Sequence, residues 1–358
     1  MDNGAPFFAF IHLLRGMAAL LVLWAHLGCW YVGTNHIATP LFSGWFEFVV
    51  KPFHLYQEGG HLGVLIFLLI SGFVITHVSM NESVKEFVLK RLFRIVPTLA
   101  VAFVVMRIAV YLSLFFNLAL PLGNEGANKV VDYVYNFFLL NWLFQKPVIL
   151  SVTWTLFIEV VFYIITAIFI SSTKKTPLRT TWHFLCLLSV VVMIAPVSPI
   201  LKNIADFAVF VIYILIGRII YLKESDRIGQ FDAIILGIAC FTTFILLYDY
   251  LYPSKLLYYP YSPLVSDILA IVIFGLAMSL CNGLTKIVAF FAEISYALYL
   301  LHLPVGCLVM NFLMNRGYKF EGALIVAIMS TILLSFVINR IVEIPAQRFV
   351  RKLIVYIK

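Results

Sequence analysis

Ten segments of this chain are apolar over lengths that cross a lipid bilayer, and this pattern limits the possible folds more than any other feature. A spanning helix needs roughly 20 apolar residues. The segments are residues 7–30, 62–80, 95–116, 151–171, 183–199, 204–222, 231–250, 264–282, 288–313 and 321–342. Backbone polar groups in hydrocarbon must be hydrogen-bonded within their own segment, so each segment is predicted to be a helix. We expect one all-α membrane domain, residues 1–358, with about ten transmembrane helices.

The composition excludes the main alternatives to this fold. The chain is 63% hydrophobic and 12% charged, whereas an ordinary soluble domain is about 25% charged. The alternation of an outer-membrane β-barrel strand is absent. The first apolar segment is long and no small-residue cleavage site follows it, so we do not expect a cleaved signal peptide.

The Lys and Arg residues predict how the helices are oriented. Alternating loops and ends divide them unequally: 17 of the 25 fall on the side of Arg15, Lys174 and Arg351, seven fall on the side of Lys51 and Lys319, and Arg107 lies within a segment. Because cytoplasmic loops carry the excess of positive charge, both termini are predicted to be cytoplasmic. Basic residues placed between apolar segments are topology signals, so the net charge of +8 does not indicate a nucleic-acid partner.

Two loops on the opposite side are long, at about 31–61 and 117–150. The second contains VVDYVYNFFLLNWLF, residues 130–144, which is apolar but short and is predicted to be an interfacial or re-entrant helix. The five cysteines show no CxxC spacing, so neither a disulfide framework nor a zinc site is expected. Histidines and carboxylates have no HExxH-like spacing, and we expect no metal.

Arg15 and His26 are the first ionisable residues that stand out, because both lie in the first apolar segment. A charged side chain at mid-membrane costs about 2.5 kcal/mol or more, so such residues mark function or internal pairing. Eleven residues of helix place the two within about 20° of one face, roughly 16 Å apart along the axis. The structural alternatives are an arginine that reaches the interface and a histidine that hydrogen-bonds a carbonyl.

Glu159 lies in SVTWTLFIEVVFYII, at a predicted depth similar to that of His26. A carboxylate there could accept a proton from the imidazole, fix its tautomer and raise its basicity. The alternative is a structural ion pair with Arg107.

Arg91 and Arg94 open the third segment in KEFVLKRLFRIVPTLAV, three residues apart on one helical face. Two neighbouring guanidinium groups make a good site for phosphate or pyrophosphate. The alternative is ordinary anchoring by positive charge on the cytoplasmic side. Ser71 and Gly72 form a small pair near mid-span, which permits close helix packing or close approach of a ligand.

The order of these segments resembles the acyltransferase-3 family of integral membrane acyltransferases. The resemblance covers most of the chain and rests on RGMAALLVLWAH, GVLIFLLISGFVI, RLFRIVP, WTLFIEVVFY, SYALYLLH and VEIPAQR, in that order. It implies about ten spanning helices in a bacterial cytoplasmic (inner) membrane. It also implies transfer of an acyl group, usually acetyl from acetyl-CoA, to a carbohydrate hydroxyl of O-antigen, exopolysaccharide or glycolipid. Proteins of surface-polysaccharide biosynthesis are the expected partners.

The resemblance also assigns residues. It implies that His26 is catalytic and that Arg15, Arg91 and Arg94 serve the CoA site. We add Glu159 as a second catalytic residue, which orients or activates His26 or contacts the acceptor. Trp154, Ser71, Tyr296 and His302 are the expected substrate-binding residues. Some members carry a fused esterase-like domain, and this chain, which ends soon after VEIPAQR, is expected to be the form without it.

Two questions stay open at this level. His26 could be a general base for direct transfer to the acceptor, or a nucleophile that carries the acyl group itself. Ten helices with buried charges also describe a secondary transporter or exporter of a sugar or lipid-linked glycan, although no matched pair of broken helices is visible.

Overall fold

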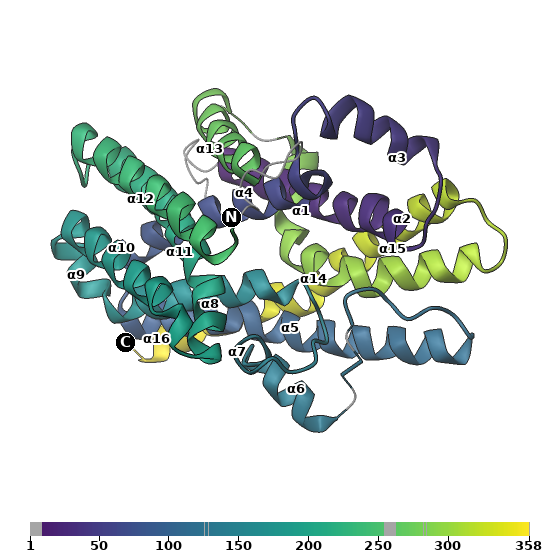
Figure 1. The fold of residues 1–358 in the computed structure, drawn as a ribbon. Helices are drawn as coiled ribbons and strands as arrows, with labels where there is room; N and C mark the ends of the chain where they lie inside the picture. The colour runs from purple at the N-terminus through teal and green to yellow at the C-terminus, as the bar shows by residue number, and fades with distance from the viewer. Residues whose placement is uncertain are drawn as a thin grey trace.

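The structure, a computed structural model, describes residues 9–357 except 125, 128, 254–262, 282 and 284, and every regular element in that part of the chain is helical (Figure 1). The α-helices are α1 (Ala9–Trp24), α2 (Tyr31–Thr34), α3 (Pro40–Trp45), α4 (Gly60–Asn81), α5 (Val84–Phe115), α6 (Val130–Phe137), α7 (Asn141–Phe144), α8 (Thr153–Ile168), α9 (Ile170–Lys175), α10 (Pro177–Met193), α11 (Pro199–Glu224), α12 (Gln230–Leu251), α13 (Pro263–Leu280), α14 (Lys286–Met314), α15 (Phe320–Ile338) and α16 (Ile344–Ile357). Three π-helical turns (Ala25–Trp30, Phe46–Val50 and Asn339–Glu343) and two 3-10 turns (Tyr56–Gly59 and Ala195–Val197) complete the set.

The predicted fold class is confirmed. Within the described residues, nine helices are long and apolar enough to cross a membrane. The fourth predicted span, 151–171, corresponds to α8, which is apolar but only 16 residues long. The third predicted span began at 95, whereas α5 begins at Val84, because a polar first turn continues the helix. Residues 7, 8 and 282 of the predicted spans lie outside the described residues.

The segment 130–144 contains no spanning helix, in agreement with the prediction. It folds as the short helices α6 and α7. On α6 the polar side chains of Asp132 and Asn136 are buried against the protein, while Val130 is 82% exposed. An apolar face turned outward and a polar face turned inward suit a helix in contact with lipid.

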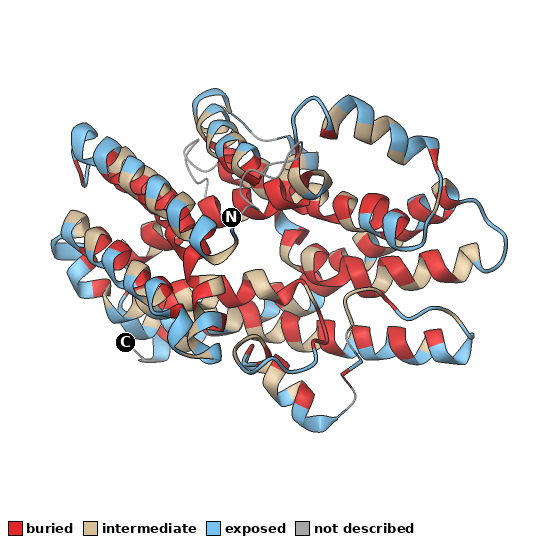
Figure 2. Ribbon diagram, viewed as in Figure 1, coloured by how far each residue is buried: buried red, intermediate tan, exposed pale blue. Residues whose placement is uncertain are grey.

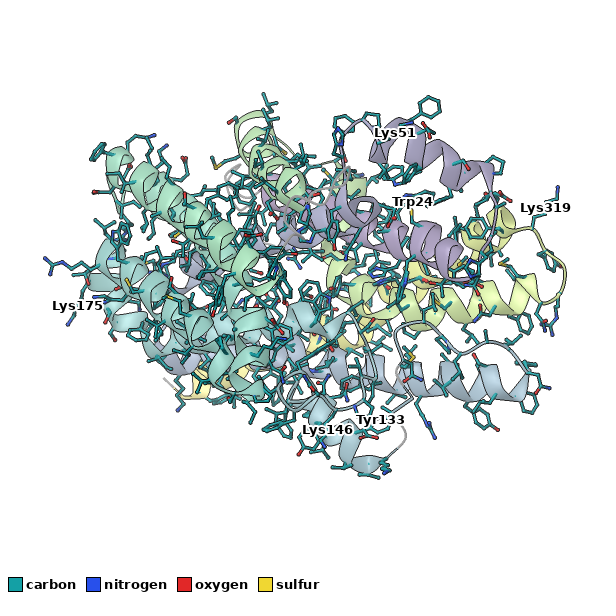
Figure 3. All side chains as sticks on the ribbon, viewed as in Figure 1. Trp24, Lys51, Tyr133, Lys146, Lys175 and Lys319 are labelled. Carbon is teal, nitrogen blue, oxygen red and sulfur yellow. The ribbon has the colours of Figure 1, made fainter. Side chains whose placement is uncertain are left out.

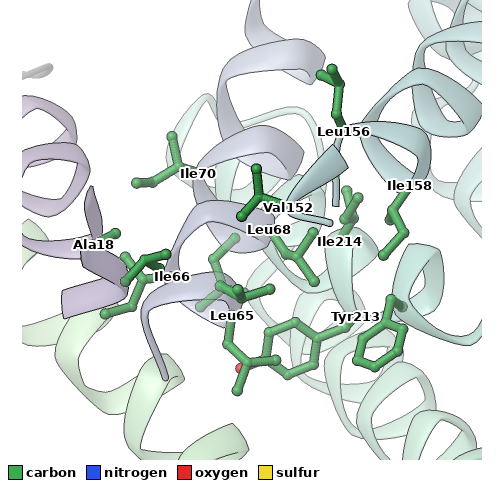
Figure 4. Packing of buried hydrophobic residues seen from close by; sticks show 14 of the residues in the cluster. Ala18, Leu65, Ile66, Leu68, Ile70, Val152, Leu156, Ile158, Tyr213 and Ile214 are labelled. Atoms are coloured by element: carbon green, nitrogen blue, oxygen red, sulfur yellow. The ribbon is translucent and has the colours of Figure 1, made fainter. Parts of the chain in front are cut away.

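The centre of the molecule is a close crossing of α4 and α11. A Cβ atom on Gly72 would lie 2.0 Å from the carbonyl oxygen of Ile214, and one on Gly217 would lie 2.1 Å from that of Leu69. Glycine is therefore required at both positions, since any side chain would separate the two backbones. Figure 4 shows the apolar side chains that fill the space around this region, with Leu65 from α4 facing residues of α11.

The outer surface is apolar where a bilayer would cover it. Phe231 on α12 is 74% exposed and Leu333 on α15 is 65% exposed. In Figure 2 the buried residues lie toward the middle of the bundle, whereas α12 and the far end of α5 carry many exposed ones. Such exposure is costly in water, and it is what lipid contact requires.

One end of the bundle gathers most of the basic residues, and we call it the basic end. Contacts between segments define it: the Lys174 ammonium donates to the Glu82 carbonyl at 2.7 Å, and Arg340 pairs with Glu293 at 3.1 Å. Lys175 and Lys319, predicted to lie on opposite sides of the membrane, stand at opposite ends of the molecule in Figure 3.

Arg218 differs from the basic residues that follow the topology rule. Arg218 is one of the 17 basic residues on the predicted cytoplasmic side, yet its side chain is fully buried among α9, α10 and α11. It donates to the Thr181 hydroxyl at 2.9 Å and the Thr173 hydroxyl at 3.1 Å, and its guanidinium lies 5.0 Å from the centre of the Phe184 ring. Arg218 therefore joins three helices internally.

Side-chain caps fix where two site-forming helices begin. The Ser83 hydroxyl accepts a hydrogen bond from the Glu86 amide at the start of α5. The Thr285 hydroxyl accepts one from the Val288 amide at the start of α14. Serine and threonine at this position satisfy amides that have no partner within the helix. The caps set the first turns of the helices that carry the predicted arginines, tyrosines and second histidine.

Candidate functional site

A large cavity opens at the basic end between α1, α5, α14 and the junction of α15 and α16. It has a volume of about 880 Å³, and we call it the basic cavity. Its lining includes two carboxylates, Glu293 and Glu343, and seven cationic side chains: Arg15, Lys90, Arg91, Arg94, Arg340, Arg348 and Arg351. Such an excess of positive charge in a concave site attracts an anionic ligand.

A second, narrower cavity continues from the first into the bundle. Arg15, Arg94 and Tyr296 line both, so these three side chains form the boundary between them. The narrow cavity provides about 80 Å³ between α1, α4, α8 and α14, enough for several water-sized groups. Its walls are mostly apolar, with a few polar groups that include Ser71 and Glu159. A slender, flexible chain fits this shape better than a ring system.

The three predicted arginines converge on the basic cavity, as the helical spacing of Arg91 and Arg94 required. The Arg15 guanidinium donates to the Ser295 hydroxyl at 3.1 Å, which fixes it across α1 and α14. The Arg91 guanidinium lies 5.7 Å from the centre of the Phe87 ring, and its Nε has no hydrogen-bond partner among the described residues. Buried donors of this kind are normally paired, so the free donor is available to a ligand.

Glu159 lies in the narrow cavity with Arg15 and Arg94, and not beside His26. Its carboxylate accepts hydrogen bonds from the Ser71 hydroxyl, at 3.2 Å, and from the Tyr163 hydroxyl. The structure therefore places the predicted carboxylate on the arginine side of the site. It does not join Glu159 to Arg107 either, since Arg107 is exposed on α5 beside α6.

The contact made by His26 is with a second histidine. The Nδ1 atom of His26 lies 3.1 Å from Nε2 of His302 on α14, and the two ring centres are 4.9 Å apart. His26 belongs to the π-helical turn Ala25–Trp30, and such turns often occur at functional sites. His302 has no exposed surface, whereas His26 is partly exposed.

Hydrogen bonds to backbone carbonyls decide which nitrogens of this pair carry hydrogen. His26 Nδ1 lies 2.9 Å from the Val22 carbonyl oxygen, and His302 Nδ1 lies 3.3 Å from that of Leu298. A carbonyl oxygen only accepts, so each Nδ1 must donate. His302 Nε2 then accepts from His26 Nδ1–H. This pattern assigns both neutral tautomers and leaves the lone pair of His26 Nε2 available.

Tyr299 lies between the narrow cavity and the histidine pair. Its side chain lines the cavity, and its ring centre is 6.0 Å from that of His302. Its hydroxyl donates to the Val152 carbonyl at 3.0 Å and lies 2.7 Å from the Thr155 hydroxyl. His26 itself does not line the narrow cavity, whereas Tyr299 both lines the cavity and packs beside His302.

The other predicted residues divide between two places. Ser71 and Tyr296 line the narrow cavity, and the Tyr296 hydroxyl donates to the Ile95 carbonyl at 3.1 Å. Trp154 lines a separate pocket at the end of the bundle away from the basic cavity. Sequence reasoning missed Ser295, the partner of Arg15, and it missed that His26 and His302 touch. Ser295 and His302 both lie in the SYALYLLH stretch. The sequence marked this stretch as part of a site but did not indicate which residues of the first apolar segment it would contact.

Of three comparisons with known proteins, only the comparison with protein-family models found a match. No curated protein and no solved structure matches the chain. A family model described as an acyltransferase domain matches residues 8–340. The matched residues include α1, α4, α5, α8 and α14, whereas α16, which lines part of the basic cavity, follows the end of the match. This match covers almost the whole chain, and the protein therefore belongs to the acyltransferase-3 family of membrane acyltransferases.

Proposed function

We propose that this membrane acyltransferase transfers an acetyl group from cytoplasmic acetyl-CoA to a hydroxyl of a carbohydrate acceptor, with His26 at the reaction centre. One observation carries the proposal. The basic cavity narrows at Arg15 and Arg94 into the narrow cavity, which Tyr299 also lines, and the Tyr299 ring centre lies 6.0 Å from that of His302, the partner of His26. An anionic head and a thin acyl-bearing arm, the two parts of acetyl-CoA, match these two shapes.

The donor would bind from the basic end. Arg91 and Arg94 both line the basic cavity, and the buried Nε of Arg91 has no hydrogen-bond partner among the described residues. Guanidinium binds phosphate in a bidentate manner. Within the part of the chain that the structure describes, Glu343 and Asn339 each have a buried side-chain oxygen without a partner, and these suit the amino group of a base. Positive charge is enriched on the cytoplasmic side of membranes, so we infer that the basic end faces the cytoplasm.

The chemistry would take place at His26 Nε2. In direct transfer, Nε2 accepts the proton of the acceptor hydroxyl while that oxygen forms a bond to the thioester carbonyl carbon. The carbon–sulfur bond breaks, and the CoA thiolate takes up the proton from His26. In the alternative route, Nε2 forms a bond to the carbonyl carbon and the carbon–sulfur bond breaks, which releases the CoA thiolate. The acceptor oxygen then forms its bond to the same carbon, the carbon–nitrogen bond breaks, and the hydroxyl proton passes to the thiolate. Both routes start from the tautomer that His302 supports.

Glu159 would act on the donor side of the site. It lies in the cavity wall with Arg15 and Arg94, and its contacts are Ser71 and Tyr163. A carboxylate there balances part of the arginine charge and holds the guanidinium groups at the entrance to the narrow cavity. We therefore assign Glu159 to donor positioning and His302 to orientation of His26.

The test is acetyl transfer by purified protein in lipid nanodiscs, with radiolabelled acetyl-CoA and the total surface-glycan extract of the source cells as acceptor. General acid–base groups contribute about 10²–10⁴-fold, so His26→Ala should lower the transfer rate by at least 10²-fold. The double variant Arg91→Ala/Arg94→Ala should raise the KM for acetyl-CoA. Arg227→Ala is the matched control, because Arg227 is exposed and lines neither cavity.

Two outcomes would contradict the proposal. Full transfer by His26→Ala at normal protein abundance would remove His26 from the reaction centre. An activity that is independent of acetyl-CoA in the wild type, such as glycan export alone, would favour the transporter considered from the sequence. The surface glycans of a deletion strain, compared by mass with those of the parent, would identify the acceptor and any dependence on surface-polysaccharide biosynthesis proteins.

A further inference from the structure

A third cavity, at the end of the bundle away from the basic cavity, has a different chemical character. It has a volume of about 440 Å³ and lies between α4, α7, α8, α11 and α12. Among the described residues, its lining contains no Lys or Arg, whereas the basic cavity has seven such residues. We call it the aromatic pocket. Its ligand is therefore neither a phosphate nor CoA.

Aromatic rings form much of its wall. Trp142 and Trp154 come from two different helices, Tyr248 comes from α12, and Tyr252 directly follows the end of α12. The Tyr248 and Tyr252 rings have their centres 5.0 Å apart, and the Trp154 ring packs edge-on against Phe210 at 5.6 Å. Tyrosine and tryptophan combine a broad apolar face with a polar edge, which suits a ligand that has C–H faces and hydroxyl edges.

The lining of the pocket also includes a carboxylate and a side-chain amide, those of Asp206 and Asn203. The Asp206 carboxylate hydrogen-bonds Tyr252 through one oxygen, while its buried Oδ1 has no partner among the described residues. Asn203 is held by its donation to the Leu143 carbonyl at 2.7 Å and accepts from the Gln145 amide at 3.1 Å. A carboxylate oxygen left without a donor in a pocket needs a ligand hydroxyl or a water.

His61 adds a second oriented group. Its Nε2 lies 3.2 Å from the Asp267 carboxylate, and both side chains are buried. A carboxylate only accepts, so Nε2 carries the hydrogen and Nδ1 is left as an acceptor. The Asp267 carbonyl accepts from the Tyr213 hydroxyl at 2.7 Å, which holds the backbone of this pair in place. The pocket thus has several hydrogen-bond acceptors that are held in place by their neighbours, and few charged side chains.

Two helices connect the aromatic pocket with the narrow cavity. On α4, His61 lines the pocket and Val64 lines the narrow cavity, about 4.5 Å farther along the axis. On α8, Trp154 lines the pocket and its neighbour Thr155 lines the narrow cavity. A ligand in the aromatic pocket therefore lies next to the route proposed for the acyl group.

We propose that the aromatic pocket binds a neutral sugar residue of the acceptor glycan, with its faces against Trp142 and Trp154 and a hydroxyl on Asp206. This inference rests on the proposed acetyl transfer to a carbohydrate. It extends that function by giving the acceptor a site of its own, separate from the cavity that takes the anionic donor.

Steady-state kinetics of two pocket variants test the inference. Acetyl transfer is measured in nanodiscs with labelled acetyl-CoA and the surface-glycan extract, each varied in turn. Asp206→Asn removes the charge but keeps the shape, and we expect the KM for the extract to rise about tenfold. Trp154→Leu should raise it similarly. For both variants the KM for acetyl-CoA should change less than twofold. Asp249→Asn is the matched control, because Asp249 is exposed on the same helix as Tyr248 and lies outside the pocket.

The outcomes separate the inference from the proposed function. An unchanged KM for the extract in both variants, with thermal unfolding like that of the wild type, would overturn the aromatic pocket as an acceptor site. A rise in the KM for acetyl-CoA instead would also overturn it, because the pocket would then serve the donor. No labelled glycan from the wild type at any extract concentration would refute the proposed acceptor class itself.

Discussion

At the residue scale, the main effect of His302 is that its Nε2 accepts a hydrogen bond from His26. Its own Nδ1 is committed to the Leu298 carbonyl, so its Nε2 can only accept. That acceptor, together with the Val22 carbonyl, keeps the hydrogen of His26 on Nδ1. The free lone pair of the neutral His26 ring is then on Nε2. A fully buried histidine on another helix thus helps to determine which nitrogen of His26 can accept a proton.

We predict that His302→Phe lowers kcat by about 5- to 10-fold, in line with the loss of one buried hydrogen bond of roughly 1 kcal/mol. The KM for acetyl-CoA should stay near that of the wild type, since His302 does not line the basic cavity. His302→Gln, whose side-chain oxygen can accept from His26 Nδ1–H, should recover most of the rate. Initial rates of both variants across pH 5–9 check this. Equal loss in both variants would point to packing alone.

At this scale the sequence predicted which residues belong to the site better than it predicted which residues they contact. Arg91 and Arg94 were expected to present a paired phosphate site because three residues of helix place them on one face, and both line the basic cavity. Glu159 was expected at the depth of His26, but depth alone does not say which way a side chain points. Its position on α8 turns it toward Ser71 and Tyr163.

At the element scale, the crossing of α4 and α11 positions the wall of the narrow cavity. Gly72 and Gly217 allow the two backbones to touch, and Ser71, next to Gly72, then donates a hydrogen bond to Glu159 in the cavity wall. The small pair noted in the sequence therefore serves both packing and the site. Helix propensity has no part in this, since glycine within a helix is unfavourable by about 1 kcal/mol.

We predict that Gly217→Val destabilises the protein by more than the 1–3 kcal/mol typical of an overpacked core, because the new Cβ would lie 2.1 Å from a backbone oxygen. Gly237→Val on α12 is the control, since no atom lies within 4 Å of a Cβ there. Thermal unfolding of the purified proteins in detergent gives the comparison. Similar unfolding temperatures for the two variants would show that the crossing tolerates a side chain.

At the scale of the whole molecule, charge and shape divide the protein into two ends. The basic cavity lies at one end, and the aromatic pocket lies away from it. The narrow cavity lies between them and shares residues with the first and helices with the second. A donor and an acceptor could then approach from opposite faces of the membrane without competing for one entrance.

This arrangement predicts the sidedness of two lysines. In a cysteine-free background, Lys319→Cys should react with a membrane-impermeant maleimide in intact cells. Lys175→Cys should react only after the membrane is opened, because we expect the basic end to face the cytoplasm. Gel-shift labelling with a polyethylene-glycol maleimide provides the measurement. The reverse pattern would invert the predicted topology and place the donor cavity on the wrong side for cytoplasmic acetyl-CoA.

The sequence by itself determined the class of protein, the approximate limits of its helices and the residues to examine, because long apolar segments and the cost of charge in lipid are local properties. Tertiary structure alone decided that His26 meets His302, that Glu159 joins the arginines, and that Trp154 belongs to a separate pocket. The contact between His26 and His302 joins positions 276 residues apart. Such contacts depend on how the helices cross and on how each is rotated about its axis. Helical periodicity predicts which side chains share a face of one helix, but it does not predict which other helix packs against that face.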